Sequence, residues 1–262
     1  MNVDETVLER ARLRFNDYAH YGYCDLTGAF PAGTLKAVAK DIESVIQAIA
    51  PERNIYGSFR KHRLSRLDEM PASAAQLIGY LNSAAFLQKL EQVSGIPDLL
   101  PDPALQGGGI HVIQRGGFLK LHTDFNWHAG LQAHRRLNLL IYLNEDWQPE
   151  WGGHIELWSP DVKHQVFSMS PTLGNALLFA TNDHSYHGHP DPLDSPEGVS
   201  RKSIALYYYT KERPVNEVVF GKSEMTNYVT RPNEHFDQDR LRSLYHRFKL
   251  RLKRLLSWWR SA

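Results

Sequence analysis

The hydrophobic pattern changes its period near residue 105, and this change limits the possible folds more than any other feature of the sequence. Before it, apolar residues recur at helical spacing, as in Thr34–Ile49 and Ser73–Ser94. Three prolines between residues 97 and 103 then interrupt the helical pattern. Over residues 109–219, short runs of strand-forming residues alternate with turns, which predicts an antiparallel sandwich or barrel. The expected strands are Ile110–Ile113, Leu137–Leu143, His154–Trp158, Gln165–Met169, Ala176–Ala180 and Ser203–Tyr209.

Length and composition fit one large domain, or a core domain with helical additions. The chain has 262 residues, 42% of them apolar, which is enough for a full core. A run of about 18 apolar residues does not occur, so we do not expect a membrane span. Met1–Glu5 contains acids where a secretory signal would be basic. Cys24 is the only cysteine, which excludes an internal disulfide and fits a reducing compartment. We therefore expect a cytoplasmic protein.

The last part of the chain is strongly basic. Asp239–Arg260 contains eight Lys or Arg and one acid, although the net charge of the whole chain is +1. Apolar residues recur at helical spacing over Asp239–Trp259, so we expect a basic amphipathic helix there. Such a helix can pack on the barrel or on a partner subunit, or it can attach the protein peripherally to an anionic membrane surface. The rest of the chain lacks a basic footprint, so nucleic acid is not expected as a partner.

Metal-binding side chains stand at the end of one expected strand. His122 and Asp124 are two residues apart and therefore project from the same side. The run Ser185–Pro190 supplies a further imidazole, and Arg201 begins a later strand. Two His and one carboxylate on one face of a metal, with the other positions open, are typical of non-haem Fe(II) oxygenases. An Arg after the second His can bind the carboxylate of an organic co-substrate.

Residues 107–210 resemble the iron- and 2-oxoglutarate-dependent dioxygenases of the prolyl-4-hydroxylase-like branch. The resemblance covers about 40% of the chain and preserves the order and spacing of the motifs. The matching segments are His122–Asp124, Leu139–Trp147, Trp151–Leu157, Gly174–Phe179, His187–Gly188 and Arg201. The resemblance implies His122, Asp124 and His187 as ligands of Fe(II), and Arg201 as the residue that binds 2-oxoglutarate.

The resemblance also implies a fold and a reaction. The fold would be a double-stranded β-helix, a jelly-roll variant, in an α+β chain with a mainly β core. We expect residues 1–220 to form the domain, with supporting helices in 1–105 and the β-helix in 107–220, and residues 221–262 to form a C-terminal helical extension. The implied reaction consumes O₂, converts 2-oxoglutarate to succinate and CO₂, and hydroxylates an unactivated C–H bond, with ascorbate as a candidate reductant.

Several residue assignments have an alternative. His184 and His189 crowd the second ligand, but the family places Gly directly after it, as in His187–Gly188. Lys202, on the opposite face of its strand, is the alternative to Arg201. Tyr142 and Asn138 are candidate co-substrate contacts, although Tyr142 can equally be a packed barrel aromatic. Related hydroxylases often have a Tyr on the strand before His122. Here that run is His111–Arg115, so the contact from this strand is open.

The substrate is left open by these motifs. A peptidyl or free amino acid such as a prolyl group, and a glycan or lipid intermediate, all fit the resemblance. A catalytically silent barrel that serves as a binding module is the alternative from another class, but it would be expected to lack a ligand. A zinc hydrolase with the same three ligands would lack an obvious general base and leave Arg201 without a role.

Overall fold

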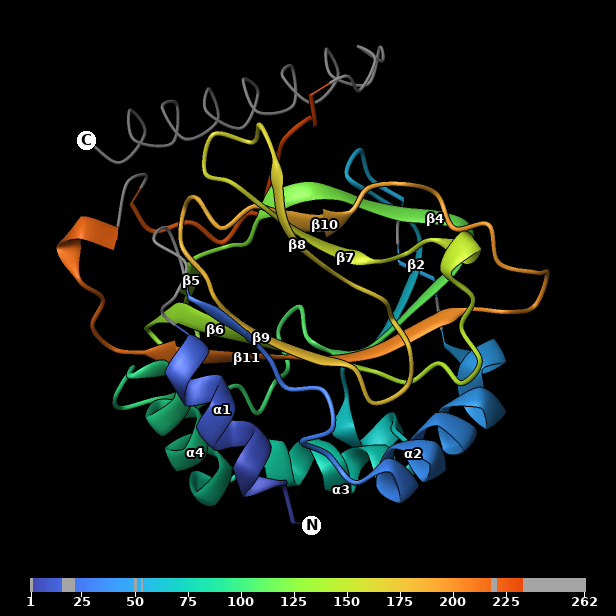
Figure 1. Cartoon of the computed structure of the whole chain (residues 1–262), viewed down its shortest axis with the longest axis horizontal. Helices are drawn as coiled ribbons and strands as arrows, with labels where there is room; N and C mark the ends of the chain where they lie inside the picture. The colour runs from blue at the N-terminus through green and yellow to red at the C-terminus, as the bar shows by residue number, and fades with distance from the viewer. Residues whose placement is uncertain (1, 16–21, 50, 53, 218–220, 233–262) are drawn as a thin grey trace, which may run out of the picture.

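The computed structural model describes residues 2–15, 22–49, 51–52, 54–217 and 221–232. Four α-helices lie together on one side of a strongly curved sheet in this part of the chain (Figure 1). They are α1 (Glu5–Arg14), α2 (Ala32–Val45), α3 (Ala72–Leu81) and α4 (Ala84–Ser94). The strands are β1 (Tyr23–Asp25), β2 (Ser58–Leu64), β3 (Leu100–Pro101), β4 (Gly109–Thr123), β5 (Trp127–His128), β6 (Ala133–Tyr142), β7 (Ile155–Trp158), β8 (Gln165–Met169), β9 (Ala176–Ala180), β10 (His187–His189), β11 (Arg201–Thr210) and β12 (Asn227–Tyr228).

The helices begin and end where short-range signals place them. Asp4 caps α1, because its carboxylate accepts hydrogen bonds from the backbone N–H groups of Thr6 and Val7. The periodic stretch Ser73–Ser94 forms two helices, since the Ser83 hydroxyl accepts a hydrogen bond from the N–H of Phe86 and starts α4. Gly95 ends α4 in the left-handed conformation, with φ of 71°.

Strand β4 closes the barrel by belonging to both of its layers. The described strands form one sheet with the order β1-β9-β6-β11-β4-β10-β7-β8, and the named pairings are antiparallel. Residues 109–113 of β4 pair with β11, whereas residues 119 and 122 pair with β10. Gly116, at φ of 76°, lies at the bend between the two halves. The architecture is the expected double-stranded β-helix, with helices covering one layer (Figure 1).

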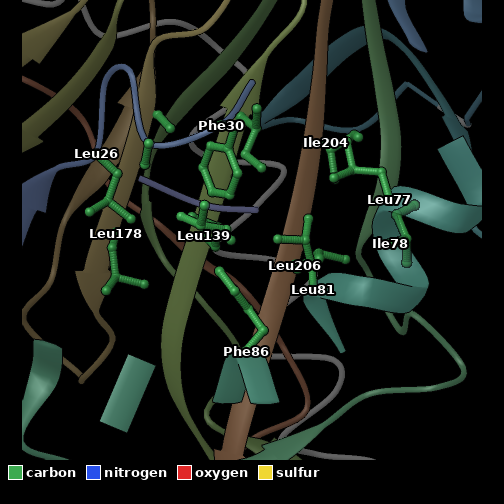
Figure 2. Close-up of a cluster of buried hydrophobic side chains, with 14 of the residues drawn as sticks. Leu26, Phe30, Leu77, Ile78, Leu81, Phe86, Leu139, Leu178, Ile204 and Leu206 are labelled. Atoms are coloured by element: carbon green, nitrogen blue, oxygen red, sulfur yellow. The ribbon is translucent and has the colours of Figure 1, made fainter. Parts of the chain in front are cut away.

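Alternation along the strands separates an outer core from the barrel interior. Leu139, Leu178, Ile204 and Leu206 face the helices, where they pack in one cluster with residues such as Phe86 (Figure 2). The intervening residues of the same strands face the interior, where Tyr142, Leu177 and Phe179 pack with Ile155 and Leu157 of the opposite layer. Both faces of this layer are therefore covered, which explains the nearly continuous apolar runs of β6 and β9.

Strands of the sheet also lie outside the range 107–220. The region 1–105 contains β1 and β2 besides its helices, and β2 is paired with β4 along the barrel. Beyond residue 220, β12 pairs with Thr123 and His122, so the described part of residues 221–262 includes a strand of the same sheet. The basic helix expected over Asp239–Trp259 lies outside the described residues. Among the described helices, none has the length and apolar character of a membrane span.

Candidate active site

Three metal-binding side chains meet inside the barrel. His122 is the second-last residue of β4, Asp124 directly follows the strand, and His187 begins β10, where it pairs with His122. One donor atom from each residue lies within 4.8 Å of the other two. Nε2 of His122 is 3.6 Å from Oδ1 of Asp124, and Nε2 of His187 is 3.3 Å from Oδ2. The ligand set expected from the sequence is thus assembled by a single cross-strand pairing and one strand end.

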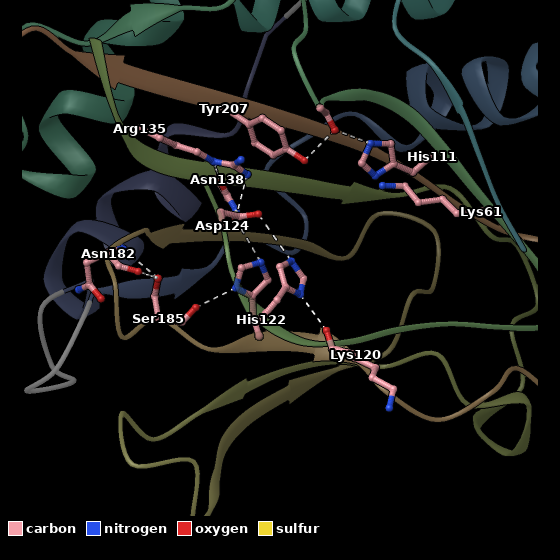
Figure 3. Close-up of polar contacts among 12 residues, drawn as sticks. Lys61, His111, Lys120, His122, Asp124, Arg135, Asn138, Asn182, Ser185 and Tyr207 are labelled. Carbon is pink, nitrogen blue, oxygen red and sulfur yellow. Dashed lines mark hydrogen bonds and ion pairs between the residues drawn. The ribbon is translucent and has the colours of Figure 1, made fainter. Parts of the chain in front are cut away.

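Backbone carbonyls fix the orientation of both imidazoles. Nδ1 of His122 donates to the carbonyl of Lys120 at 2.8 Å, and Nδ1 of His187 donates to that of Ser185 at 2.9 Å (Figure 3). A carbonyl only accepts, so the proton of each neutral ring resides on Nδ1 and the lone pair on Nε2. Burial lowers the pKa of His122, as does the neighbouring His187. His122 is therefore held in its metal-binding form.

Two side chains of β6 hold the carboxylate of Asp124. Nη2 of Arg135 is 2.9 Å from Oδ2, and the amide of Asn138 donates to the same oxygen at 2.8 Å. Arg135 also donates from Nε to the Asn138 carbonyl oxygen, which fixes the direction of the amide (Figure 3). Burial by itself would raise the pKa of Asp124, but Arg135 and the adjacent imidazoles keep it well below its usual range. Asp124 is thus an anion, with Oδ1 available to a metal.

Arg201 is positioned as a cation for an organic anion. It is 4% exposed, its Nε donates to the carbonyl of Gly153 at 2.7 Å, and its Nη2 donates to the Tyr142 hydroxyl at 3.1 Å. Among the described residues no carboxylate lies within ion-pair distance of it. Lys202 points the other way and pairs with Glu43 at 2.7 Å. Arg201, rather than Lys202, therefore faces the metal-binding cavity.

The other sequence candidates lie close to these groups. Asn138 lines the cavity and bonds Asp124, while Tyr142 is fully buried and bonds Arg201. Their direct contact with a co-substrate stays a prediction. His189 also lines the cavity, but the three-residue cluster contains His187 and not His189.

Cross-strand register builds the rest of the cavity wall. Lys61 of β2, Ile113 of β4 and Arg201 of β11 form one row across the sheet. Arg63, His111 and Ser203 form the next row on the same three strands. All six line a cavity of about 160 Å³ that also contains the metal-binding residues. His111 and Ile113 are thus the inward residues of the first half of β4, the segment that precedes His122.

Sequence reasoning missed Lys61, Arg63, Arg135 and Ser203. Ser203 could have been found, because it lies two residues after Arg201 on a strand and shares its face. The inward direction of Lys61 and Arg63 depends on β2, which stands in a region that was expected to be helical. Arg135 gave no comparable signal, since its ion pair with Asp124 depends on the arrangement of two separate segments.

The donor set fits Fe(II) and 2-oxoglutarate. Two neutral imidazoles and one carboxylate on one side leave the remaining metal positions to other ligands. Arg201 offers a buried guanidinium to the distal carboxylate of a dicarboxylic acid. A family model described as the 2OG-Fe(II) oxygenase superfamily matches residues 108–209. A search of curated proteins found no match.

Solved structures share the fold. A Pseudomonas putida prolyl-4-hydroxylase is 17% identical and aligns over 77% of this chain and 100% of its own, with a TM-score of 0.57. A Trichoplax adhaerens prolyl hydroxylase, solved with a hypoxia-inducible-factor peptide, is 16% identical over 79% and 92%, with a TM-score of 0.58. HygX from Streptomyces hygroscopicus, solved with nickel, 2-oxoglutarate and hygromycin B, is 16% identical over 83% and 97%, with a TM-score of 0.50. Residues 108–209 are a domain of the 2OG-Fe(II) oxygenase superfamily, and the chain is a 2-oxoglutarate-dependent non-haem Fe(II) dioxygenase.

Proposed function

We propose that this dioxygenase hydroxylates an unactivated C–H bond of a small molecule or of an amino-acid side chain. One observation carries the proposal: the cluster of His122, Asp124 and His187 shares its cavity with Arg201, a buried cation without an acidic partner among the described residues. A silent binding module would have no use for a complete ligand set. The zinc-hydrolase alternative gives Arg201 no role.

Each residue has a separate task in this proposal. His122, Asp124 and His187 hold Fe(II), and Arg201 holds the distal carboxylate of 2-oxoglutarate with support from Tyr142. The bound metal and co-substrate supply the oxidising power, with O₂ consumed and 2-oxoglutarate converted to succinate and CO₂. Arg135 and Asn138 keep Asp124 ionised and oriented. Phe179 packs against the His187 ring, with a centroid distance of 4.7 Å, and shields that ligand on the apolar side.

The fold accommodates substrates of more than one chemical class. The similar structures include enzymes whose titles name a hypoxia-inducible-factor peptide and hygromycin B, so this fold serves both peptides and small molecules. Among the substrate classes expected from the sequence, amino acids and glycan intermediates both remain within the proposal. A cytoplasmic location, use of ascorbate, and a membrane or subunit contact by residues 239–259 are further proposals that rest on the sequence alone.

The test compares two adjacent cations. Arg201→Ala should weaken 2-oxoglutarate binding to the Ni(II)-loaded protein by at least about thirtyfold, because loss of a buried charged partner costs roughly 2–5 kcal/mol. Lys202→Ala is the matched control, since Lys202 contacts Glu43 outside the barrel. Calorimetry with Ni(II) prevents turnover during the titration. Equal 2-oxoglutarate affinity in the parent protein and Arg201→Ala would contradict the assignment.

Asp124→Ala tests the metal site separately. This change removes the only anionic ligand of the cluster, so Ni(II) affinity should fall by several orders of magnitude. Dialysis against Ni(II) followed by metal analysis measures the occupancy. Full occupancy in Asp124→Ala would show that the metal binds elsewhere.

A further inference from the structure

The cavity has a second cationic wall besides Arg201. Lys61 and Arg63 are two residues apart on β2 and both line the cavity. Their side chains are 13% and 30% exposed. Glu52 is their shared partner, 3.6 Å from Nζ of Lys61 and 2.9 Å from Nε of Arg63. Two cations therefore share one carboxylate next to the active site.

Arg201 and this second wall lie in different parts of the cavity. Strand β4 separates β2 from β11, so the backbones of Lys61 and Arg201 are two strand spacings, roughly 10 Å, apart. The Arg201 guanidinium bonds Gly153 and Tyr142, and Tyr142 stands on β6, the neighbour of β11 on the side away from β2. Lys61 stands on β2, and its side chain lies beside that of His111 (Figure 3). One carboxylate bound to Arg201 would leave Lys61 and Arg63 unused.

The charges of the cavity favour an additional anion. Four cations line it, namely Lys61, Arg63, Arg135 and Arg201, against the single acid Asp124. With Glu52 included, two positive charges remain in excess. Fe(II) and the dianion of 2-oxoglutarate cancel each other and leave this excess unchanged. Uncompensated charge in a partly desolvated cavity is costly, and an anionic substrate would relieve that cost.

A side chain of β12 lines the cavity next to the metal ligands. Tyr228 of β12 lies against the His122 ring, with a centroid distance of 5.5 Å. Its ring occupies the space where Gly57 would carry a Cβ atom, at 2.0 Å. A strand paired with β4 thus covers the edge of the barrel beside the metal ligands. A cavity of about 160 Å³ behind such a cover suits a small molecule better than a folded protein surface.

We propose that the substrate is a small organic acid, or a small phosphate or sulfate ester, whose oxyanion is bound by Lys61 and Arg63 while its C–H bond faces the metal. This inference rests on the proposed function, because it treats the same cavity as an oxygenase site. Planar carboxylates and tetrahedral oxyanions both suit an Arg beside a Lys. The two sources are separated by the probes below.

The experiment measures anion binding without turnover. Full-length protein loaded with Ni(II) and saturating 2-oxoglutarate is titrated with acetate, phosphate, sulfate and the uncharged dimethyl sulfone. At least one anion should bind, and dimethyl sulfone should not. Lys61→Met and Arg63→Met should each weaken that anion by at least about tenfold, as expected when one partner of a charged contact is lost. If acetate binds most tightly, the substrate is expected to be a carboxylic acid. If phosphate or sulfate binds most tightly, it is expected to be a phosphate or sulfate ester.

Two further variants and one comparison of affinities serve as controls. Arg60→Met is the matched control, because Arg60 is exposed and bonds the Arg115 carbonyl outside the cavity. Lys61→Arg retains the charge and should keep most of the anion affinity. Anion affinity should also fall more than 2-oxoglutarate affinity in Lys61→Met. A greater fall in 2-oxoglutarate affinity would overturn the proposal, as would equal losses in Arg60→Met or no anion binding by the parent.

A second arm identifies products. A metabolite extract is separated by anion exchange into acidic, neutral and cationic fractions, and each is incubated with enzyme, Fe(II) and 2-oxoglutarate. A hydroxylated product in the acidic fraction supports the inference, and a product only in the neutral or cationic fraction overturns it. Unchanged 2-oxoglutarate affinity in Arg201→Ala would contradict the proposed function instead. Anion binding at Lys61 and Arg63 is measured independently of that result.

Discussion

Arg135 and Asp124 form an ion pair inside the barrel, with Nη2 of the Arg 2.9 Å from Oδ2 of the metal-binding carboxylate. The Arg side chain is 1% exposed, and its guanidinium lies over the rings of Tyr207 and Phe125. A buried carboxylate without a cation would be unstable in the metal-free protein. Arg135 therefore compensates Asp124 before the metal binds and fixes which oxygen is available.

Arg135→Gln should destabilise the metal-free protein strongly. Removing one partner of a buried pair costs about 3–5 kcal/mol in the free energy of unfolding, because the other charge stays buried. A bound divalent metal compensates Asp124 in place of the Arg, so Ni(II) should stabilise the variant more than it stabilises the parent. Chemical denaturation with and without Ni(II) measures both effects.

The neighbouring Arg136 provides the control for this experiment. It pairs with Glu217 and donates to Thr210, away from the metal-binding residues. Arg136→Gln can lower stability, but Ni(II) should raise the free energy of unfolding of this variant by the same amount as that of the parent. If Ni(II) stabilises Arg135→Gln no more than it stabilises the parent, Arg135 has a purely structural role.

Tyr142→Phe should weaken 2-oxoglutarate binding without loss of the metal. The change removes the hydroxyl that accepts from Arg201, at 3.1 Å, and a hydrogen bond of this kind contributes roughly 0.5–1.5 kcal/mol. We expect about a two- to tenfold loss of 2-oxoglutarate affinity by calorimetry. Tyr208→Phe is the control, since its hydroxyl donates to the Leu81 carbonyl on the helix side. A larger effect of Tyr208→Phe on 2-oxoglutarate affinity would contradict this role.

The sequence predicts the parts of the site that depend on short-range order. His122 and Asp124 share a face because they are two residues apart, and Arg201 and Lys202 are separated by strand alternation. The ring of supporting residues depends instead on register between distant strands. Lys61 lines the cavity because a shift of register between Phe59 and Lys61 sets its pairing with Ile113. Sequence periodicity does not indicate such a pairing. For this reason β2 was not predicted within a region of helical character.

Gly188→Ala should force β10 and β4 apart and thereby disturb the two metal-binding imidazoles. A Cβ at this position would lie 2.7 Å from the Leu119 carbonyl oxygen and 2.8 Å from that of Lys120. The Lys120 carbonyl also orients His122, so the clash acts on both imidazoles. We expect at least about a tenfold loss of Ni(II) affinity and roughly 1–3 kcal/mol of stability.

Gly79→Ala is the matched control for the change at Gly188. Gly79 lies exposed within α3, and an added Cβ would meet no atom within 4 Å. Alanine there should leave Ni(II) affinity unchanged and raise stability by about 0.5–1 kcal/mol, because helices disfavour glycine. Parent-like Ni(II) affinity in Gly188→Ala would mean that β10 and β4 can move apart without disturbing the ligands.

The metal-free protein should lose stability as the pH falls below about 6.5, the usual value for His. Burial, together with Lys61 and Arg63, keeps the pKa of His111 well below that value in the folded state. The unfolded chain then binds a proton that the folded protein does not, so stability is complete above the unfolded pKa and declines below it. The slope is up to about 1.4 kcal/mol per pH unit for one His.

His111→Gln should reduce this loss of stability. Glutamine does not titrate, and its amide can still donate to the Gly107 carbonyl that His111 contacts at 3.0 Å. Between pH 7 and 5.5 the variant should lose less stability than the parent, by up to about 1.3 kcal/mol. Urea denaturation of metal-free protein at several pH values measures the difference, with exposed His164→Gln as the control. A pH profile of His111→Gln that matches the parent would show that His111 does not couple folding to protons in this range.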